Sequence, residues 1–363
     1  MVMRRNYGVG RLSRRAFLGG AGGVLLAPAT AAQAQRADRG GMTFFRIGTA
    51  ATGGTYFPIG GLLANTISNP PGSRSCADGG SCGVPNMIAV AQSTHGSVDN
   101  VHQMAQGALD SALIQADVAY WAYKGERMFA EAGPQDNLRA IANLYPESVH
   151  LVVATRTGIF WMKQLVAKKL SLDRIGSGTR VDAKVIMKAY GISMNAFEDV
   201  AVPAGRAADM IRDGDLDGFF FVGGAPARAI ADLAEDVSIR LVPFDDTEAE
   251  VLTLTYPFFT QHSISAGTYR NVPQTKTLAV GAQWLVNAEM PEDTIYGITR
   301  ALWHERTRAL LDGGHPKAQE IRPETALTGL GVPLHPGARR YYAEVGWVAD
   351  TPPADRVEPI LAE

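Results

Sequence analysis

Residues that could hold an anion stand at the start of the first predicted helix. The stretch "GTAATGGTYFPIGG", from Gly48 to Gly61, follows the apolar residues "FFRI" and precedes the helical pattern "LLANTI". A strand, a glycine-rich turn and a helix in this order cradle an anion on backbone N–H groups, and the helix dipole adds about half a positive charge. The candidate groups are Gly54, Thr55 and Tyr56. A turn that only permits a close strand–helix connection uses the same residues, so this motif alone leaves both interpretations open.

Four later stretches repeat this arrangement of small and polar residues. They are "HGSVDN", "IQADV", "GSGT" and "FFFVGGAP", and each lies at the carboxyl end of a predicted strand or at the helix start that follows it. Open α/β sheets bind ligands at that edge, so we expect the five motifs to share one site. A plain helix cap is the alternative for Ser97, Asp117 and Thr179. The candidate residues of these stretches are Ser97, Gln115, Asp117, Ser177, Gly178, Thr179, Phe221, Val222 and Gly223.

Motifs for catalysis are missing from the sequence. Neither a "GxSxG" nucleophile elbow nor an "HExxH" zinc helix occurs, and the seven histidines show no metal-ligand spacing. A phosphate-binding loop needs a lysine after its last glycines, where this chain has Tyr56 after "GGT". We therefore predict capture of a small anion with no reaction, no cofactor and no metal. A periplasmic enzyme with Asp117 or a histidine as its base is the alternative.

The N-terminus has the pattern of an export signal. Five arginines and no acid precede the apolar run "AFLGGAGGVLLAPATAA", and small residues follow, which predicts a signal peptide over residues 1–34. The stretch "SRRAFLGG" is a twin-arginine pattern, and it predicts export of the folded chain to the periplasm. The whole chain has 34 basic and 36 acidic residues, so removal of the signal leaves a net charge of about −7. A net negative charge does not favour binding to nucleic acid or to an anionic membrane.

The two cysteines lie close together in "SRSCADGGSCGVP". Asp78 and Gly79 favour a tight turn between Cys76 and Cys82, so in an oxidising compartment the pair predicts a local disulfide. A metal site is the alternative, but no further cysteine or suitably spaced histidine completes one.

The elements that position these motifs alternate between strand and helix patterns. Apolar strands are expected at 44–50, 87–92 and 111–115, each followed by a helical pattern, and two more strands at 138–146 and 149–155. The same alternation of strands and helices restarts near residue 170. One long helix is expected between Pro291 and Gly313, because proline is common at the start of a helix and glycine at its end. Alternation of this kind predicts right-handed βαβ units and a mainly parallel sheet. Two short helices are expected after Pro323 and Pro336.

The predicted fold class is α/β, with two lobes. The first lobe takes residues 43–146 and 261–363, and the second lobe, 147–260, is inserted in it, because the last hundred residues hold too little strand for a third domain. Two crossings between the lobes make a hinge, and a cleft is expected between them.

The motifs together resemble one family of transport receptors. "IGTAATGGTYFPIGG", "HGSVDNV", "LIQADVAYWAYKG", "LRAIANLYPESVHLVV", "GSGT", "DGFFFVGGAPARAI" and "LHPGARRYY" are similar to the TAXI family of solute-binding proteins, over about residues 44–346. The resemblance implies the type II periplasmic-binding-protein fold, with a hinge and an interlobe ligand cleft. It also implies a small carboxylate-bearing solute such as glutamate or a related acid, and delivery to the membrane permease subunits of a TRAP transporter.

The resemblance assigns ligand contacts to the motif residues named above, with Asp117 the least certain of them. Arg180, which follows "GSGT", either pairs with a second carboxylate of the ligand or points to solvent. The segment that carries the cysteines is longer than the family pattern and lies before Ser97. A receptor for an ATP-driven importer is a further alternative.

Overall fold

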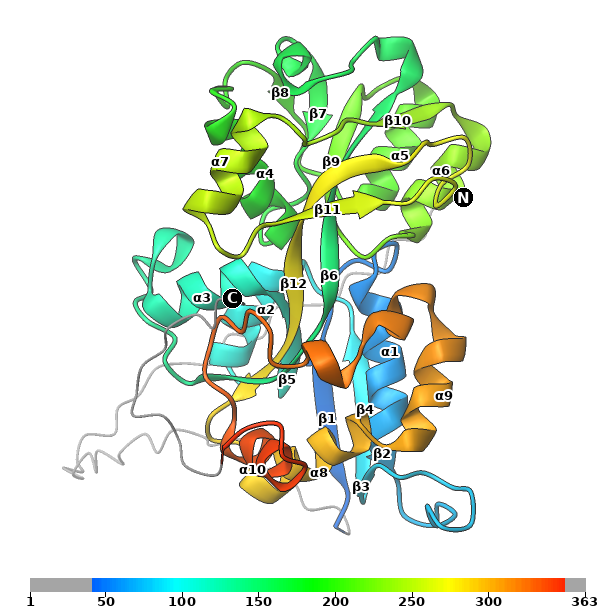
Figure 1. Ribbon diagram of the computed structural model, residues 1–363, viewed down its shortest axis with the longest axis vertical. Helices are drawn as coiled ribbons and strands as arrows, with labels where there is room; N and C mark the ends of the chain where they lie inside the picture. Colours follow the sequence, from blue (N-terminus) through cyan, green and yellow to red (C-terminus); the bar gives the residue numbers. More distant parts are fainter. Residues whose placement is uncertain (1–40, 350–363) are drawn as a thin grey trace, which may run out of the picture. The chain divides into compact units, whose positions relative to one another are not determined.

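Parallel strands and the helices that follow them build the first lobe. The computed structural model describes residues 41–349. Strand β1 pairs in parallel with β4 and β5, and a helix follows each of these three strands (Figure 1). The elements are β1 (Thr43–Gly48), α1 (Tyr56–Ile67), β2 (Ser68–Asn69), β3 (Val84–Pro85), β4 (Met87–Gln92), α2 (Ser97–Ala105), β5 (Ser111–Gln115), α3 (Ala116–Lys124) and η1 (Arg127–Phe129).

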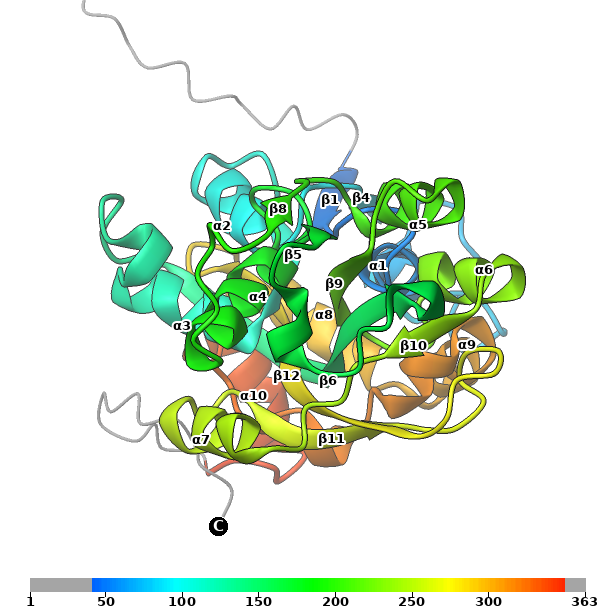
Figure 2. The same ribbon diagram turned by 90° about the horizontal axis from the view of Figure 1, so that it is seen from above.

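The second lobe follows the same strand–helix logic. Strand β7 pairs in parallel with β8 and β9, and helices α5 and α6 pack against each other beside them (Figure 2). Its elements are η2 (Thr155–Thr157), η3 (Met162–Leu165), β7 (Lys169–Ser171), α4 (Gly178–Ala189), β8 (Glu198–Asp199), α5 (Ala204–Asp213), β9 (Gly218–Gly223), α6 (Arg228–Asp236), β10 (Ile239–Leu241), α7 (Thr247–Thr255) and β11 (Thr260–Ile264).

Two long strands, β6 (Leu138–Ala154) and β12 (Thr275–Asn287), connect the lobes. They pair with each other in antiparallel fashion, and β12 also pairs with β5 of the first lobe. The far end of β6 pairs with β9 of the second lobe, from Ser148 opposite Gly223 to Val153 opposite Gly218. The predicted α/β fold with two lobes is therefore confirmed.

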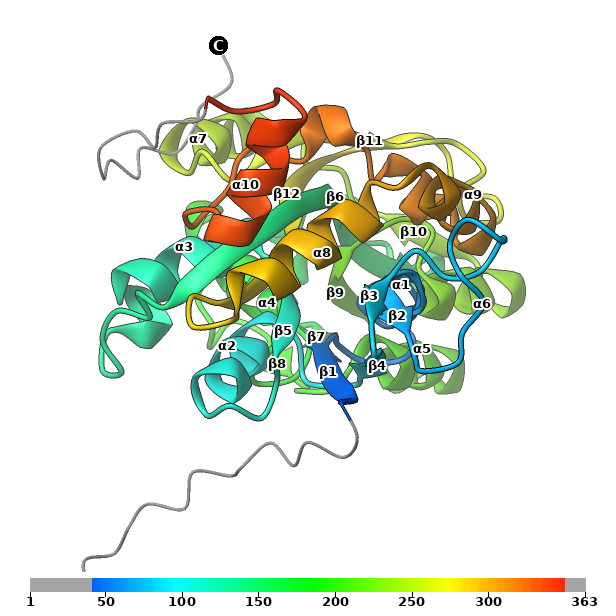
Figure 3. The same ribbon diagram turned by 90° about the horizontal axis from the view of Figure 1, so that it is seen from below.

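The remaining helices return to the first lobe. Helix α8 (Glu292–Leu302) packs against α1 and α10 (Figure 3). The others are α9 (Glu305–Gly314), η4 (Pro316–Glu320), η5 (Pro323–Thr325) and α10 (Pro336–Glu344). No helix within residues 41–349 combines the length and the apolar character that crossing a membrane requires. The predicted signal peptide and its twin-arginine pattern lie outside the described residues.

Buried apolar side chains form three clusters. Phe45 and Ile47 of β1 belong to the first-lobe cluster with Trp284, and complete burial of such a side chain contributes about 1.5–3 kcal/mol. A second-lobe cluster joins α5, α6 and β9 with Tyr269 and Val272. A third cluster contains residues of both lobes along β6 and β12, so one face of the two connecting strands has a continuous core. The predicted lobe limits at residues 147 and 260 remain a prediction.

Two sequence predictions about the sheet are wrong. The stretches 138–146 and 149–155 form one strand, because the ladder to β12 and then to β9 continues through Glu147 and Ser148. The sheet is also less parallel than predicted, since β6 and β12 run antiparallel to each other and to several neighbours. One connecting strand leads into the second lobe and the other leads back, so the two must run in opposite directions.

The long helix predicted between Pro291 and Gly313 is also wrong, because it is two helices. His304 has an extended backbone, and its Nδ1 accepts a hydrogen bond from the Arg306 amide. The Thr307 hydroxyl donates to the Ala301 carbonyl at 2.6 Å. These side-chain bonds replace the helical ladder at this point, which is how capping residues compete with a continuous helix.

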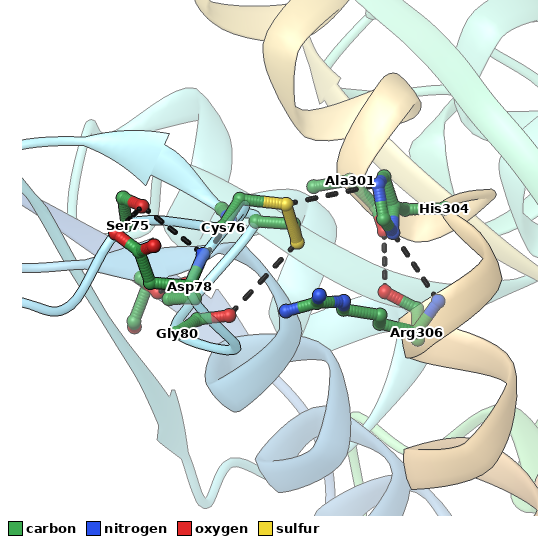
Figure 4. Close-up of a disulfide and its surroundings, with 12 residues drawn as sticks. Ser75, Cys76, Asp78, Gly80, Ala301, His304 and Arg306 are labelled. Carbon is green, nitrogen blue, oxygen red and sulfur yellow. Dashed lines mark hydrogen bonds between the residues drawn. A yellow bond between two sulfur atoms is a disulfide. The ribbon is translucent and has the colours of Figure 1, made fainter.

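The cysteine-bearing loop packs against this helix break. Cys76 and Cys82 are joined by a disulfide, and Cys76 Sγ lies 3.7 Å from His304 Nε2 (Figure 4). Within the loop, the Ser75 hydroxyl donates to the Asp78 carboxylate at 2.6 Å. Both cysteines are bonded to each other, so these sulfur atoms are not free to hold a metal ion.

Candidate functional site

A cavity of about 50 Å³ lies between the lobes. It is lined by all of the predicted contact residues except Asp117 and Arg180. Those lining residues are Gly54, Thr55, Tyr56, Ser97, Gln115, Ser177, Gly178, Thr179, Phe221, Val222 and Gly223. The five glycine-rich and polar motifs, which are far apart in the sequence, therefore face one cavity.

Three helices begin at the cavity wall. Helix α1 begins at Tyr56, α4 at Gly178 and α5 at Ala204, and these residues line the cavity together with Gly205. Within residues 41–349, the amides of Tyr56, Gly178 and Gly205 donate to no other group. The first amides of a helix have no intrahelical partner and carry its positive dipole end. The wall therefore presents free hydrogen-bond donors from both lobes to an anion.

Gly178 is required where α4 approaches the first lobe. A Cβ at this position would lie 1.4 Å from Gln115 Oε1 and 2.9 Å from Ser97 Oγ. A side chain at this position would displace the Gln115 side chain, whereas glycine lets α4 begin in contact with it.

The start of helix α2 has a different role. The amides of Val98 and Asp99 donate to the carbonyl of Gly176 in the second lobe, at 3.1 and 3.0 Å. The Ser97 hydroxyl accepts a hydrogen bond from the Gln115 amide at 3.1 Å. Helix α2 therefore holds the lobes together and positions Gln115, and its Val98 and Asp99 amides are not available to a ligand.

The two predicted threonines also bond to the backbone. The Thr55 hydroxyl donates to the Gly224 carbonyl across the lobes at 2.8 Å. The Thr179 hydroxyl accepts from the Val222 amide at 3.0 Å. Both hydroxyls therefore fix the cavity walls, and anion binding is left to the backbone amides.

Glu147 is a cavity residue that the sequence analysis missed. Its carboxyl is buried and accepts a hydrogen bond from the Tyr56 hydroxyl at 2.6 Å. Burial raises the pKa of Glu147 to about 8, although the bond from Tyr56 lowers it, and Asp117 raises it further. The sequence does offer one sign of this role: Glu147 lies within a long apolar stretch, and burying an unpaired charge is costly unless it has a partner.

Asp173, Arg174 and His95 also line the cavity and were missed. Asp173 lies in a loop with a positive φ of 71°, and burial raises its pKa to about 6. The Asp173 carboxylate accepts a hydrogen bond from the Arg174 amide at 2.7 Å. The cavity therefore has an arginine and free amides for an anion, beside two carboxyls that can face a cation.

Arg180 and Asp117 lie away from the cavity lining. The Arg180 guanidinium forms an ion pair with Asp199 and donates to the Asp173 carbonyl at 2.9 Å. Arg180 therefore neither faces a ligand carboxylate nor points to solvent. Its side chain stabilises the loop before α4. Asp117 is fully buried behind the cavity, in contact with Asp182 of α4.

The fold and the cavity define a two-lobed α/β protein with a candidate site between its lobes. The chain belongs to the NMT1-like family, whose model matches residues 47–346.

Several solved structures are similar to this chain at low identity. The alkanesulfonate-binding protein SsuA from Xanthomonas axonopodis pv. citri, bound to MOPS, is 14% identical over 78% of this chain and 85% of that chain, with a TM-score of 0.42. PhnD1 from Prochlorococcus marinus, in complex with methylphosphonate, is 8% identical over 84% and 99%, with a TM-score of 0.48. The periplasmic aliphatic sulphonate binding protein SsuA from Escherichia coli is 13% identical over 82% and 77%, with a TM-score of 0.40. Similarity at this level assigns no ligand to this chain.

Proposed function

We propose that the protein is a periplasmic solute-binding receptor that captures a small carboxylate-bearing solute and releases it unchanged. One observation carries the proposal: free amides at the starts of α1, α4 and α5, from both lobes, line one cavity. A carboxylate accepts charge-assisted hydrogen bonds from such amides, and neither lobe supplies all of them. A ligand that contacts both lobes therefore favours the closed form.

Glu147 and Arg174 support an amino acid with an acidic side chain as the ligand. The free amides and the Arg174 guanidinium suit two carboxylates. A ligand ammonium group beside Glu147 would favour its ionised form, although the pKa of this carboxyl is about 8 without a ligand. The Tyr56 hydroxyl fixes the orientation of Glu147 from one side. A glutamate-like solute has these three groups within a few bonds of one another.

Calorimetric titration with four probes tests the ligand class. We expect L-glutamate to bind at least tenfold more tightly than glutarate, which has the same two carboxylates and no ammonium group. Taurine and methylphosphonate test whether the site prefers a sulfonate or a phosphonate. If none of the four binds and native mass spectrometry of gently purified protein finds no retained acid, the receptor function is wrong. Conversion of a bound acid to a product would favour the enzyme alternative.

A matched pair of glycine variants tests the location of the site. Gly178→Ala places a methyl group against Gln115 and should weaken L-glutamate binding more than tenfold. Gly61→Ala is the control, because a methyl group added at this α1 glycine would have no neighbour within 4 Å outside its own helix. Equal affinities of the two variants would exclude the cavity as the binding site.

The permease partner has two candidates. The resemblance of the motifs to the TAXI family supports delivery to TRAP-type permease subunits, which use an ion gradient. An ATP-driven importer is the second candidate, because the similar solved structures include sulfonate-binding proteins, one of them described as part of an ABC transporter. Uptake measured in cells separates the two: collapse of the ion gradient stops the first kind of transport directly, and it leaves ATP-driven uptake running while ATP is maintained.

A further inference from the structure

Two aspartates from different lobes meet behind the cavity. Asp117 lies in the first turn of α3 in the first lobe, and Asp182 lies on α4 in the second lobe. Both side chains are completely buried. The Gln115 side-chain amide donates to Asp182 Oδ2 at 3.0 Å, so a residue of the cavity wall connects this pair to the ligand site.

The two carboxyl groups lack donors for most of their oxygen atoms. Among the described residues, the two Asp117 oxygens and Asp182 Oδ1 have no hydrogen-bond partner. The backbone amides of Asp117 and Val118 at the start of α3 favour the ionised form of Asp117, but burial outweighs them. Two ionised carboxylates buried against each other repel strongly. One shared proton removes this repulsion and supplies a hydrogen bond between them. Burial, with the charge of Asp117, accordingly raises the pKa of Asp182 well above its usual range, and burial also raises the pKa of Asp117.

The charged groups around the pair do not neutralise it. Glu147 on β6 adds negative charge, and Arg127 of η1 is a cation that favours ionised Asp117. On α4 itself, Arg180 is paired with Asp199, and Lys184 and Lys188 are exposed. Helix α2, which packs against α3, carries Asp99 and His102, and Asp99 accepts hydrogen bonds from the His95 amide and the Gln103 side chain. Helix α7, which packs against α4, carries Glu248 and Glu250 in its first turn.

We propose that closure of the lobes captures one proton between Asp117 and Asp182, so that ligand capture and proton uptake are coupled. The proposal rests on the proposed function only in taking ligand capture to close the lobes. When the lobes separate, water reaches both carboxyls and both ionise at neutral pH. On closure, solvent supplies one proton to the pair, and on opening the proton returns to solvent.

The sign of the effect follows from linkage. Because the closed form binds the extra proton, low pH favours closure, and the ratio of closed to open protein falls by up to about tenfold for each pH unit between the open-state and the closed-state pKa. Glu147 titrates in the same cavity, so the experiment must separate its contribution from that of the pair.

Spin labels on the two lobes measure closure without any ligand. Both native cysteines are in the disulfide, so cysteines introduced at the exposed positions Gln106 and Lys184 can be labelled selectively. The label–label distance distribution of the full mature protein is recorded between pH 5 and pH 8.5, at fixed salt, for the parent and four variants. The variants are Asp182→Asn, Asp117→Asn, Glu147→Gln and the exposed control Asp232→Asn.

The proposal predicts that the closed fraction of the parent rises as the pH falls. Either asparagine variant of the pair should lose the part of the pH dependence that Glu147→Gln keeps, because an amide needs no proton to bond to the remaining carboxylate. Glu147→Gln and Asp232→Asn should keep the pH dependence. The proposal is wrong if both asparagine variants keep the full pH dependence of the parent. It is also wrong if the closed fraction at fixed pH changes with the sodium concentration instead. Failure of L-glutamate to bind would count against the proposed function alone, since this measurement uses no ligand.

Discussion

Replacing Glu147 by glutamine should stabilise the protein at alkaline pH and leave its stability nearly unchanged at acid pH. The buried Glu147 carboxyl has a pKa of about 8, whereas a glutamate in the unfolded chain titrates near 4.5. Between these values the folded chain holds a proton that the unfolded chain releases. The free energy of unfolding therefore falls as the pH rises through this window. Glutamine keeps the size of the side chain and an oxygen that accepts the Tyr56 hydroxyl.

The size of the effect follows from the distance between the two pKa values. Each pH unit of difference corresponds to about 1.4 kcal/mol, so a gap of about 3.5 units gives up to roughly 5 kcal/mol at pH 9. Local relaxation reduces such values, and we expect Glu147→Gln to be about 3–5 kcal/mol more stable than the parent at pH 9 and within about 1 kcal/mol at pH 4.5.

Urea unfolding at several pH values measures this difference directly. Asp117 and Asp182 are common to both proteins, so the difference between the two curves reports Glu147 together with its charge interaction with this pair. Glu131→Gln, at an exposed position, is the matched control and should show a small difference that does not depend on pH. A difference between parent and Glu147→Gln that stays constant from pH 4.5 to pH 9 would refute the reasoning about this carboxyl.

Three further predictions concern the cavity, the disulfide and export. Tyr56→Ala should weaken L-glutamate binding more than tenfold while the protein stays folded by circular dichroism, because Glu147 loses the hydroxyl that orients it; unchanged affinity would count against the site. Replacing both Cys76 and Cys82 by serine should lower the free energy of unfolding by about 2 kcal/mol, the value for so short a loop. Ligand affinity of that double variant should stay within twofold, and a large loss would give the loop a role in binding. Arg14→Lys with Arg15→Lys should stop export of the precursor, as fractionation and immunoblotting would show, and normal export would exclude the twin-arginine route.

The sequence predicted the cavity wall well where the signal is local. Glycine turns and helix starts such as "GGTYF" and "GSGT" have a fixed relation to the strand before them. Their amides are placed by backbone geometry alone, so a strand–turn–helix pattern is sufficient to bring them to one edge of the sheet. The structure accordingly lines one cavity with Tyr56, Gly178 and Gly223.

The sequence failed where a role depends on contacts between distant residues. Glu147 was missed because its partner Tyr56 is 91 residues away, and Arg180 became a ligand candidate because Asp199 could not be seen as its partner. The start of α5 at Ala204 follows Pro203 and carries no glycine-rich strand–turn motif, so its first-turn amides were not among the candidates. The long predicted helix was broken by His304, whose capping role cannot be read from periodicity.

A crystal structure of the protein grown with L-glutamate tests the central claim most directly. We predict a ligand carboxylate at about 3 Å from amides of at least two of the helices α1, α4 and α5, with the ligand ammonium facing Glu147 and the molecule intact. A glutamate bound elsewhere on the protein, or an empty cavity at saturating concentration, would contradict the claim that amides of both lobes enclose a shared anionic ligand.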